Sequence, residues 1–285
     1  MRILILGCNG MAGHMIGLYL KERGYNVEGF ARKKSKFFNT IVGDVKNTEL
    51  LLRIIEGEKY NIMINCVGIL NQDAENNHEK AVYLNSYFPH FLEKTTENLD
   101  TQIIHISTDC VFSGRKGKYT EKDFPDGEKF YDRSKALGEL INNKDVTLRM
   151  SIIGPDINKE GIGLINWFMQ QKDCVNGYKN VIWTGQTTLQ LAKTIEKIII
   201  DRPHGLYNMV PENSISKYDL LLLFNRYLKH NQIKIEPEEN IKIDKSLKRT
   251  NYEKFNYIIP EYEQQIKDLE KWMNEHKELY PHYHL

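Results

Sequence analysis

Two side chains with clear chemical potential, Tyr131 and Lys135, stand four residues apart in the segment Y-D-R-S-K. On a helix this spacing places them on the same face, about one turn apart. A free tyrosine has a pKa near ~10, and a lysine ammonium within a few ångströms favours the phenolate. Lowering that pKa to about 7 requires roughly 4 kcal/mol of differential interaction. We therefore predict that Tyr131 acts as a general acid towards a carbonyl that is being reduced, with Lys135 lowering its pKa.

A third polar group, S-T-D at residues 107–109, ends the apolar run that begins near Gln102. The hydroxyl of Thr108 could bridge the phenol to an oxygen of the substrate, and Asp109 follows directly. A Y-x-x-x-K pattern also occurs on ordinary helix surfaces, where both side chains are solvated. The S-T-D segment at a strand end and the glycines at the N-terminus favour the catalytic interpretation.

The N-terminal segment G-C-N-G-M-A-G at residues 7–13 carries a glycine pattern between an apolar strand and a helix. Glycine lets the backbone turn tightly and approach a pyrophosphate, and the following helix offers its N-terminal amides to the anion. The G-x-x-G-x-x-G spacing is one residue longer in its first gap than the G-x-G-x-x-G fingerprint. We predict a dinucleotide site here, rather than a turn that only packs the helix against the strand. The glycines of this site are Gly7, Gly10 and Gly13.

Basic residues follow the second predicted strand, which spans residues 26–31: Arg32, Lys33 and Lys34. Enzymes that prefer NADH usually place Asp or Glu here to bond the ribose 2′-hydroxyl. A basic cluster suits a 2′-phosphate instead, and the planar guanidinium of Arg32 is its best candidate. We therefore favour NADPH over NADH, with a solvated basic turn as the alternative.

Strands and helices alternate along the first 150 residues, which indicates an α/β fold with a doubly wound parallel sheet of the Rossmann type. In such sheets ligands bind beyond the carboxyl ends of the strands. Asp44 follows one of the predicted strands, so it could meet the adenosine of the cofactor, or it could cap the helix that follows it. The other predicted elements include strands at 40–45, 61–68 and 102–109, a polar loop at 71–80 and a helix from about 78 to 98. The predicted strand-end residues are Gly7, Asp44, Gly68 and Thr108.

The regular alternation of predicted strands and helices ends after Gly154 and Pro155. We expect residues 1–150 to form a dinucleotide-binding domain, to which 181–205 return. Residues 151–180 and 206–285 would then form a smaller C-terminal α/β substrate-binding domain.

Composition excludes several classes of protein. The 285 residues carry a net charge of +1 without a long basic stripe, so no nucleic-acid partner is expected. No run of about 18 apolar residues is present, so no membrane span is expected. The four cysteines lack C-x-x-C spacing, which indicates a reduced, cytoplasmic setting and no metal site. A homodimer is left open.

The assembled motifs resemble the extended short-chain dehydrogenase/reductase family and, within it, the nucleotide-sugar reductases of the dTDP-4-dehydrorhamnose reductase branch. G-x-x-G-x-x-G together with Y-x-x-x-K is specific for the superfamily, and S-T-D followed by V-F is typical of that branch. Weaker similarity extends over nearly the whole chain. The segments that carry the resemblance are G-C-N-G-M-A-G (7–13), G-D-V (43–45), H-I-S-T-D-C-V-F-S-G (105–114), Y-D-R-S-K (131–135) and L-R-M-S (148–151).

The resemblance implies a role for each matching residue. Tyr131 would protonate the C4 oxygen of a sugar, Lys135 would lower its pKa and hold the nicotinamide ribose, and Thr108 would orient the carbonyl. The pyrophosphate would contact Gly10, Met11 and Ala12. The adenosine and ribose would lie against Asp44, Val45, Val67 and Gly68. The substrate would lie against Thr108, Asp109, Ile152 and Trp183.

The function implied by the resemblance is NADPH-dependent reduction of the 4-keto group of a nucleotide-linked 4-keto-6-deoxyhexose, for surface polysaccharide synthesis. The branch carries a tryptophan where this chain has Ile152, so a UDP-linked, N-acetylated sugar is as plausible as a dTDP-linked one. Two alternatives stay open. One is a nucleotide-sugar epimerase or epimerase–reductase, for which His78, Cys110 and Lys159 are the extra acid–base candidates. The other is a non-catalytic, NADP-binding regulatory subunit.

Overall fold

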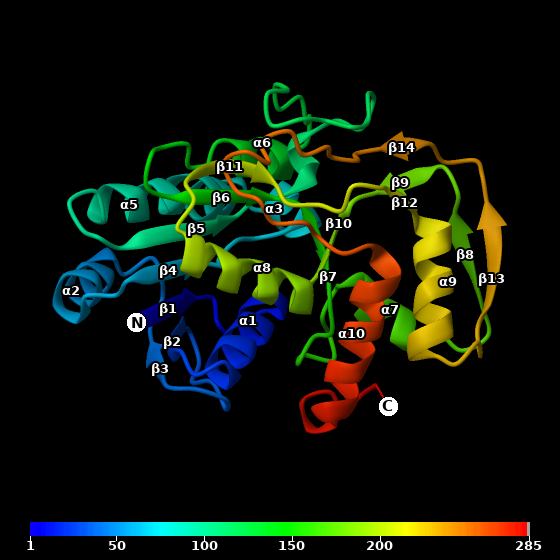
Figure 1. Ribbon diagram of the computed structural model, residues 1–285, viewed down its shortest axis with the longest axis horizontal. Coiled ribbons are helices and arrows are strands. Elements are labelled where there is room, and N and C mark those ends of the chain that lie inside the picture. The colour runs from blue at the N-terminus through cyan, green and yellow to red at the C-terminus, as the bar shows by residue number, and fades with distance from the viewer. Residues whose placement is uncertain (284–285) are drawn as a thin grey trace.

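Seven parallel strands form the central sheet of the computed structural model, which describes residues 1–283. The chain order reverses between β1 and β4, and the carboxyl ends of the strands at such a switch point are where doubly wound sheets bind their ligands. The predicted doubly wound parallel sheet is confirmed (Figure 1). From edge to edge the strands are β11 (Gly205–Asn208), β6 (Val146–Arg149), β5 (Gln102–Ile106), β4 (Ile62–Asn65), β1 (Arg2–Leu6), β2 (Asn26–Ala31) and β3 (Thr40–Val42).

Helices cover both faces of this sheet because the side chains of a strand alternate between its two faces. In β1, Ile3 and Ile5 belong to one hydrophobic cluster, whereas Leu4 and Leu6 belong to another. The first cluster includes α1 (Met11–Glu22) and α8 (Thr188–Asp201). The second includes α2 (Thr48–Glu58) and α5 (Phe88–Thr95). Both faces of β1 are therefore buried, which explains its continuous apolar sequence.

The segment between β4 and β5 is more helical than the sequence indicated. A short helix, α3 (Asn71–Asn76), occupies most of the predicted polar loop. The predicted long helix begins at residue 78 and consists of α4 (His78–Ala81), a π-helical segment η1 (Val82–Tyr87) and α5. Its regular part ends at Thr95 rather than near Asn98. Ala74 of α3 is fully buried, so packing stabilises a helix that polar composition alone argues against.

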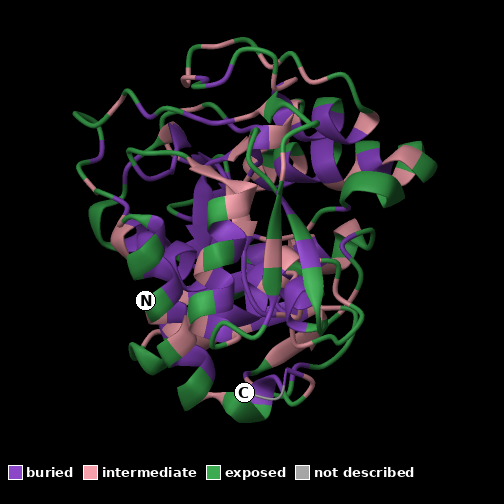
Figure 2. Ribbon diagram, turned by 90° about the vertical axis from the view of Figure 1, so that its right-hand side faces the viewer, coloured by how far each residue is buried: buried purple, intermediate pink, exposed green. Residues whose placement is uncertain are grey.

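A second hydrophobic core lies to one side of the sheet, on the right of Figure 1. Met15 of α1 contributes to it, so the two parts of the molecule share this helix. Strands β8 and β13 pair at its outer side, where Figure 2 shows alternating buried and exposed residues. The elements around this core are α7 (Leu164–Met169), β8 (Cys174–Tyr178), β9 (Val181–Trp183), β12 (Ile215–Ser216), α9 (Lys217–Leu228), β13 (Lys234–Glu238), β14 (Ile243–Asp244) and α10 (Tyr262–Glu275).

The boundaries of the two parts follow from strand pairing. β11, at residues 205–208, is the outermost strand of the central sheet. β10 (Gly185–Thr187) pairs outside that sheet with β7 (Ser151–Ile153), and α8 then returns to pack against α1. Since β9 lies at the second core and β11 ends at Asn208, the returning segment runs in the structure from about residue 185 to 208 rather than from 181 to 205. The division into a dinucleotide-binding and a substrate-binding domain is retained as a proposal.

Two general features of the described residues bear on function. The four cysteines are all free thiols. None of the helices within residues 1–283 has the length and apolar character required to span a membrane.

Candidate active site

The glycine loop between β1 and α1 forms an open cradle at the switch point. Gly7 has a φ of +80°, a conformation that favours glycine, and a Cβ there would lie 3.1 Å from the carbonyl oxygen of Cys66. A Cβ on Gly13 would collide with the carbonyl oxygen of Gly7. Gly10 is the N-cap of α1 and brings no side chain to the first amides of the helix. Those amides, at Met11 and Ala12, are therefore free to bind a pyrophosphate, so the cradle fits a dinucleotide.

The end of the neighbouring strand β4 lies beside the glycine loop. β4 pairs with β1, so Val67 lies next to the glycine loop, with its Cγ2 atom 3.3 Å from the Cβ that Gly7 would carry. The amide of Val67 donates to Oδ1 of Asn65 at 3.1 Å, which fixes the backbone just before Gly68. Gly68 is exposed, and its backbone can approach a ribose closely.

Arg32 and Asp44 lie at the ends of β2 and β3. Arg32 is exposed, and the adjacent turn is tied to the glycine loop because Asn9 Nδ2 donates to the carbonyl oxygen of Lys33 at 2.8 Å. Asp44 is also exposed, and its carboxylate accepts from the amide of Lys46 at 2.9 Å. The cap of α2 is Asn47 and not Asp44, so the carboxylate of Asp44 is not committed to that helix. Val45 beside it is buried.

Thr108 and Asp109 lie where β5 gives way to a short 3₁₀ helix, η2 (Asp109–Val111). Thr108 caps this helix, because its Oγ1 accepts from the amide of Cys110 at 3.1 Å. The same hydroxyl donates to Oδ1 of Asp109 at 3.2 Å, and Ser151 donates to that oxygen at 2.7 Å. Both Thr108 and Asp109 are buried, so this corner holds their side chains in fixed orientations.

Tyr131 and Lys135 lie one turn apart on α6 (Phe130–Ala136), as their spacing predicted. The phenol ring is buried in a small cluster with Ala74 and Ala81, and its hydroxyl interacts with the Thr108 side chain. The Nζ atom of Lys135 donates to the carbonyl oxygen of Ile106, the last residue of β5, at 2.8 Å. The proposed catalytic set Thr108, Tyr131 and Lys135 therefore meets at the carboxyl end of β5.

The pKa of Tyr131 is raised in this structure, whereas the sequence analysis expected it to be lowered. Burial, followed by the nearby Cys110 thiol, raises the pKa of Tyr131, and the interaction with Thr108 offsets only part of this. Burial also lowers the pKa of Lys135 to about 8, partly offset by the charge of Glu139. The lysine ammonium is itself desolvated and bonded to a carbonyl, so it does not act on the phenol as an exposed cation would.

A carboxylate that sequence reasoning missed, Glu75 of α3, supports α6. Its two oxygens accept from the amides of Tyr131 at 2.9 Å and Phe130 at 3.3 Å. These bonds lower the pKa of Glu75, with the bond from Tyr131 as the largest cause. Glu75 thus holds the start of α6, although it stands more than 50 residues earlier in the chain.

A buried ion pair lies behind Lys135. Arg149 of β6 donates from Nε to Glu139 Oε1 at 2.7 Å, and its Nη2 lies 2.6 Å from Oε2. Ser107 also donates to Glu139, at 2.7 Å. Both charged side chains are almost completely buried, so each is stabilised by the other. The L-R-M-S motif therefore supplies a structural cation that fixes the strand and the turn after α6.

The predicted substrate-side residues differ in their surroundings. Ile152 lies on β7 and is half-buried. Trp183 is only 4% exposed, and its ring lies 5.5 Å from that of Tyr262 in the second core. Its contact with a substrate stays a prediction. Lys217 of α9, which the sequence analysis did not single out, lies beside Trp183, with its Nζ atom 5.6 Å from the centroid of the Trp183 ring.

The extra acid–base candidates for an epimerase are less well suited. His78 stacks on Phe130 with ring centroids 3.9 Å apart, and Lys159 is exposed. Cys110 lies beside Tyr131, but burial raises the pKa of its thiol to about 12. A thiolate base at neutral pH is therefore disfavoured.

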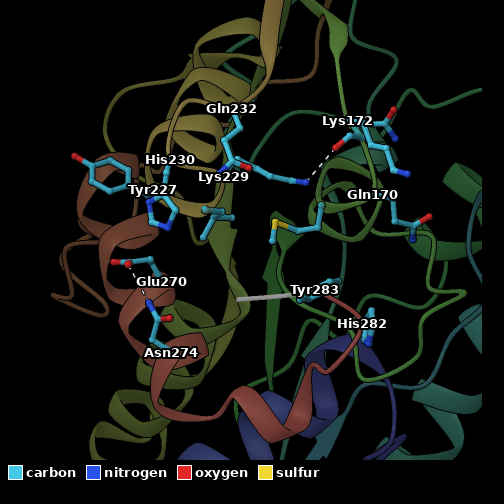
Figure 3. A pocket seen from close by; sticks show the side chains of 13 residues that line it. Gln170, Lys172, Tyr227, Lys229, His230, Gln232, Glu270, Asn274, His282 and Tyr283 are labelled. Carbon is cyan, nitrogen blue, oxygen red and sulfur yellow. Dashed lines mark hydrogen bonds between the residues drawn. The ribbon is translucent and has the colours of Figure 1, made fainter.

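A separate cavity of about 380 Å³ lies among α7, α9 and α10 (Figure 3). Two of its polar side chains have partners within the wall: Lys229 donates to the carbonyl of Gln171 at 3.0 Å and Asn274 donates to Glu270 at 3.0 Å. None of the predicted site residues lines it. Within residues 1–283 no group of three or more His, Cys, Asp or Glu side chains could hold a metal ion.

The glycine loop, the strand-end residues and the Tyr131–Lys135 pair together define a site of the extended short-chain dehydrogenase/reductase class. The chain belongs to the family described as RmlD substrate binding domain, whose model matches residues 1–284. The predicted membership of the nucleotide-sugar reductase branch is thereby confirmed.

Individual relatives agree with this assignment. The chain is 27% identical over 233 residues to a dTDP-4-dehydrorhamnose reductase from Aggregatibacter actinomycetemcomitans, a match that covers 78% of this chain and 77% of the relative. It is 25% identical over 235 residues to methionine adenosyltransferase 2 subunit beta from Xenopus laevis, covering 77% and 70% of the two chains.

A solved structure matches the fold over nearly its whole length. The crystal structure of dTDP-4-dehydrorhamnose reductase from Bacillus anthracis in complex with NADP superposes with a TM-score of 0.79 at 21% identity. The match covers 94% of this chain and 98% of that chain. At this identity the likeness establishes the shared fold.

Proposed function

We propose that the protein uses NADPH to reduce the 4-keto group of a nucleotide-linked 4-keto-6-deoxyhexose, in the synthesis of a surface polysaccharide. The observation that carries this proposal is the meeting of Tyr131, Thr108 and Lys135 at the end of β5, two strands along the sheet from the glycine cradle. One relative and one structural neighbour are dTDP-4-dehydrorhamnose reductases, which supports the proposal, and that neighbour was crystallised with NADP.

The residues of the chain would divide the reaction among them. Bound NADPH would supply the hydride that reaches C4. Tyr131, which burial keeps protonated, would donate its phenolic proton to the oxygen on C4, so that the carbonyl becomes an alcohol. Thr108 would orient that oxygen, since its hydroxyl is fixed between Asp109 and the amide of Cys110. Lys135 would offer its ammonium to the ribose, with Arg32 meeting the 2′-phosphate.

The identity of the sugar is the finer part of the proposal. Ile152 stands where the branch carries a tryptophan, and Cys110 follows Asp109, so no aromatic platform from those two residues faces the sugar. A UDP-linked, N-acetylated 4-keto sugar is therefore included beside the dTDP-linked one.

The test is NADPH oxidation with a panel of dTDP-, UDP- and GDP-linked 4-keto sugars. We expect turnover with at least one of them, and a loss of about 10²- to 10⁴-fold in kcat/KM in Tyr131→Phe, since that variant lacks the acidic proton. The affinity for NADP⁺ should be unchanged because the ring remains packed. Tyr207→Phe is the matched control, because Tyr207 is also buried but its hydroxyl donates only to the carbonyl of His204, at 3.0 Å.

Two results would contradict the proposal: no oxidation with any sugar of the panel, or full activity in Tyr131→Phe. The likeness to methionine adenosyltransferase 2 subunit beta favours one second candidate, a subunit that binds NADP without turnover. Tight NADP(H) binding without reduction, together with co-purification of a larger enzyme, would support that candidate instead.

Three further proposals concern the setting of the protein. We place it in the cytoplasm, which agrees with four free thiols. We expect it to act without nucleic acid. A homodimer is the oligomeric state to test, by sedimentation of the purified chain.

A further inference from the structure

Lys217 brings a positive charge to the substrate side of the site from the second part of the chain. It is the first residue of α9, directly after the N-cap Ser216. The short strand β12 pairs antiparallel with β9, with Ile215 opposite Trp183. This pairing fixes the start of α9 against the tryptophan, and the Nζ atom of Lys217 lies 5.6 Å from the centroid of its ring.

The ammonium group acts electrostatically on the corner that follows β5. Burial is the main influence on Lys217 and lowers its pKa, while the carboxylate of Asp109 and, less strongly, the Cys110 side chain raise it. Those two residues directly follow Thr108, which is next to the phenol of Tyr131. The charge of Lys217 therefore acts on the corner that holds Thr108 and Asp109, although Lys217 belongs to a different part of the fold.

Lys217 is partly buried, and the charge of Asp109 offsets only part of the effect of burial on its ammonium. Within the described part of the chain, Lys217 has no carboxylate at ion-pair distance and no hydrogen-bond acceptor, and its one close polar contact is the Trp183 ring. Other partly buried lysines do have such partners. These are Lys193 with Asp268 at 2.5 Å, Lys229 with the Gln171 carbonyl at 3.0 Å and Lys245 with Asp132 at 3.8 Å.

An unpaired, desolvated cation is costly, and an anion that binds to it offsets that cost. The diphosphate is the part of a sugar nucleotide that carries full negative charge, and lysine binds phosphate oxygens as a compact point charge. We infer that Lys217 binds the diphosphate of the sugar nucleotide, with Trp183 supporting its side chain. This inference rests on the proposed function, since it takes the substrate to be a sugar nucleotide whose C4 carbonyl lies at Tyr131.

The experiment measures binding of UDP and dTDP, by calorimetry, to wild type, Lys217→Met and Lys217→Arg. We expect at least a tenfold loss of affinity in Lys217→Met for the nucleoside diphosphate that wild type binds more tightly. Lys217→Arg keeps the charge and should stay within about threefold. NADP⁺ affinity should be equal in all three proteins. Lys229→Met is the matched control, because this lysine lies just beyond the other end of α9, is also partly buried, and lines the separate cavity.

Three outcomes would overturn the inference. One is equal affinity of wild type and Lys217→Met for both nucleoside diphosphates, and another is no binding of either by wild type. A raised KM for a sugar nucleotide with unchanged nucleoside diphosphate affinity would assign Lys217 to the sugar instead. If Lys217→Met does not fold, as judged by its circular dichroism, Lys217→Gln replaces it. Diphosphate binding that depends on Lys217 without any turnover would contradict the proposed reduction but support this inference.

Discussion

Tyr131 and Lys135 respond to burial in opposite directions. Loss of water disfavours the charged form of each group, so the pKa of the phenol is raised while that of the lysine falls to about 8. Near neutral pH the phenol therefore keeps its proton, as a donor to a carbonyl must. The lysine titrates close to neutral pH, so its charge responds to the groups around it.

The first prediction concerns the stability cost of Lys135. Its pKa is about 8 in the fold against an ordinary value of 10.5, so protonated Lys135 destabilises the folded state by about 3 kcal/mol below pH 8. From pH 8 to 10.5 the unfolded chain binds more protons than the fold, so this contribution to the free energy of unfolding rises with pH. Lys135→Met should therefore be at least as stable as wild type at pH 7, while its reductase activity is lost.

The measurement is urea unfolding of both proteins at pH 7 and pH 9.5. The advantage of the variant should shrink at the higher pH. Only the difference between the two proteins is used, because buried thiols and phenols titrate in both. Lys135→Met also loses the hydrogen bond from Nζ to the carbonyl oxygen of Ile106, which costs about 1 kcal/mol. This cost is part of the measured difference between the two proteins. A variant that is clearly less stable at pH 7, with a difference independent of pH, would contradict the prediction.

At the scale of elements, α3 and α6 form one unit because Glu75 accepts the amides that begin α6. Tyr131, the proposed proton donor, is the second residue of that helix, so a shift of the helix start moves the phenol. The carboxylate form of Glu75 is the stabilising one, since the fold lowers its pKa. Its contribution is present above the ordinary pKa of a glutamate and is lost as the pH falls through the lowered value.

The second prediction follows from this contact. Glu75→Ala should lower the free energy of unfolding by about 1 kcal/mol, as the loss of a helix cap does. It should also lower kcat more than it changes NADP⁺ affinity, because the tyrosine and not the glycine loop is displaced. Glu75→Gln keeps one acceptor oxygen and should lie between wild type and Glu75→Ala.

Asp73→Ala is the control for this variant. Asp73 is also on α3, but its carboxylate pairs with Lys80 at 2.8 Å and touches no residue of α6. That variant should keep its kcat. Equal losses of kcat in Asp73→Ala and Glu75→Ala would show that α3 as a whole matters, rather than the contact of Glu75 with α6.

At the scale of the molecule, α1 joins the two hydrophobic cores. Ile16 packs in the core of the sheet and Met15 in the second core. Between them and the glycine loop lies His14, fully buried, with Nδ1 3.0 Å from the carbonyl oxygen of Gly10 and Nε2 3.0 Å from the hydroxyl of Tyr280. The C-terminal segment therefore reaches the dinucleotide cradle through a single histidine.

The third prediction tests this connection with Tyr280→Phe. The variant leaves one nitrogen of a fully buried imidazole without its partner, which costs about 1–3 kcal/mol in the free energy of unfolding. NADP⁺ affinity should also fall, because His14 holds the carbonyl of the N-cap glycine. Tyr283→Phe is the control: its hydroxyl accepts from the amide of Asp156 at 2.8 Å, so it should lower stability without changing NADP⁺ affinity. Unchanged NADP⁺ affinity in Tyr280→Phe would show that the tail does not act on the cradle.

The parallel sheet, the glycine turn and the pairing of Tyr131 with Lys135 were all predictable from the sequence. Each depends on a local property of the backbone. Side chains alternate along a strand, glycine accepts a positive φ, and residues four apart on a helix share a face. Helix α3 was missed because its polar segment lacks a clear apolar stripe, and contacts with α4 and α6, which lie later in the chain, stabilise it.

The sequence by itself therefore determined the class of fold, the glycine cradle and the placement of Tyr131 and Lys135 on one helix face. Only the tertiary structure decided which side chains support that donor, since Glu75 and Lys217 reach the site from distant segments. It also decided the direction of the pKa shifts, which the spacing of Tyr131 and Lys135 had suggested wrongly for the phenol. The physical reason is that spacing fixes which groups are neighbours on one element, whereas desolvation depends on everything packed around them.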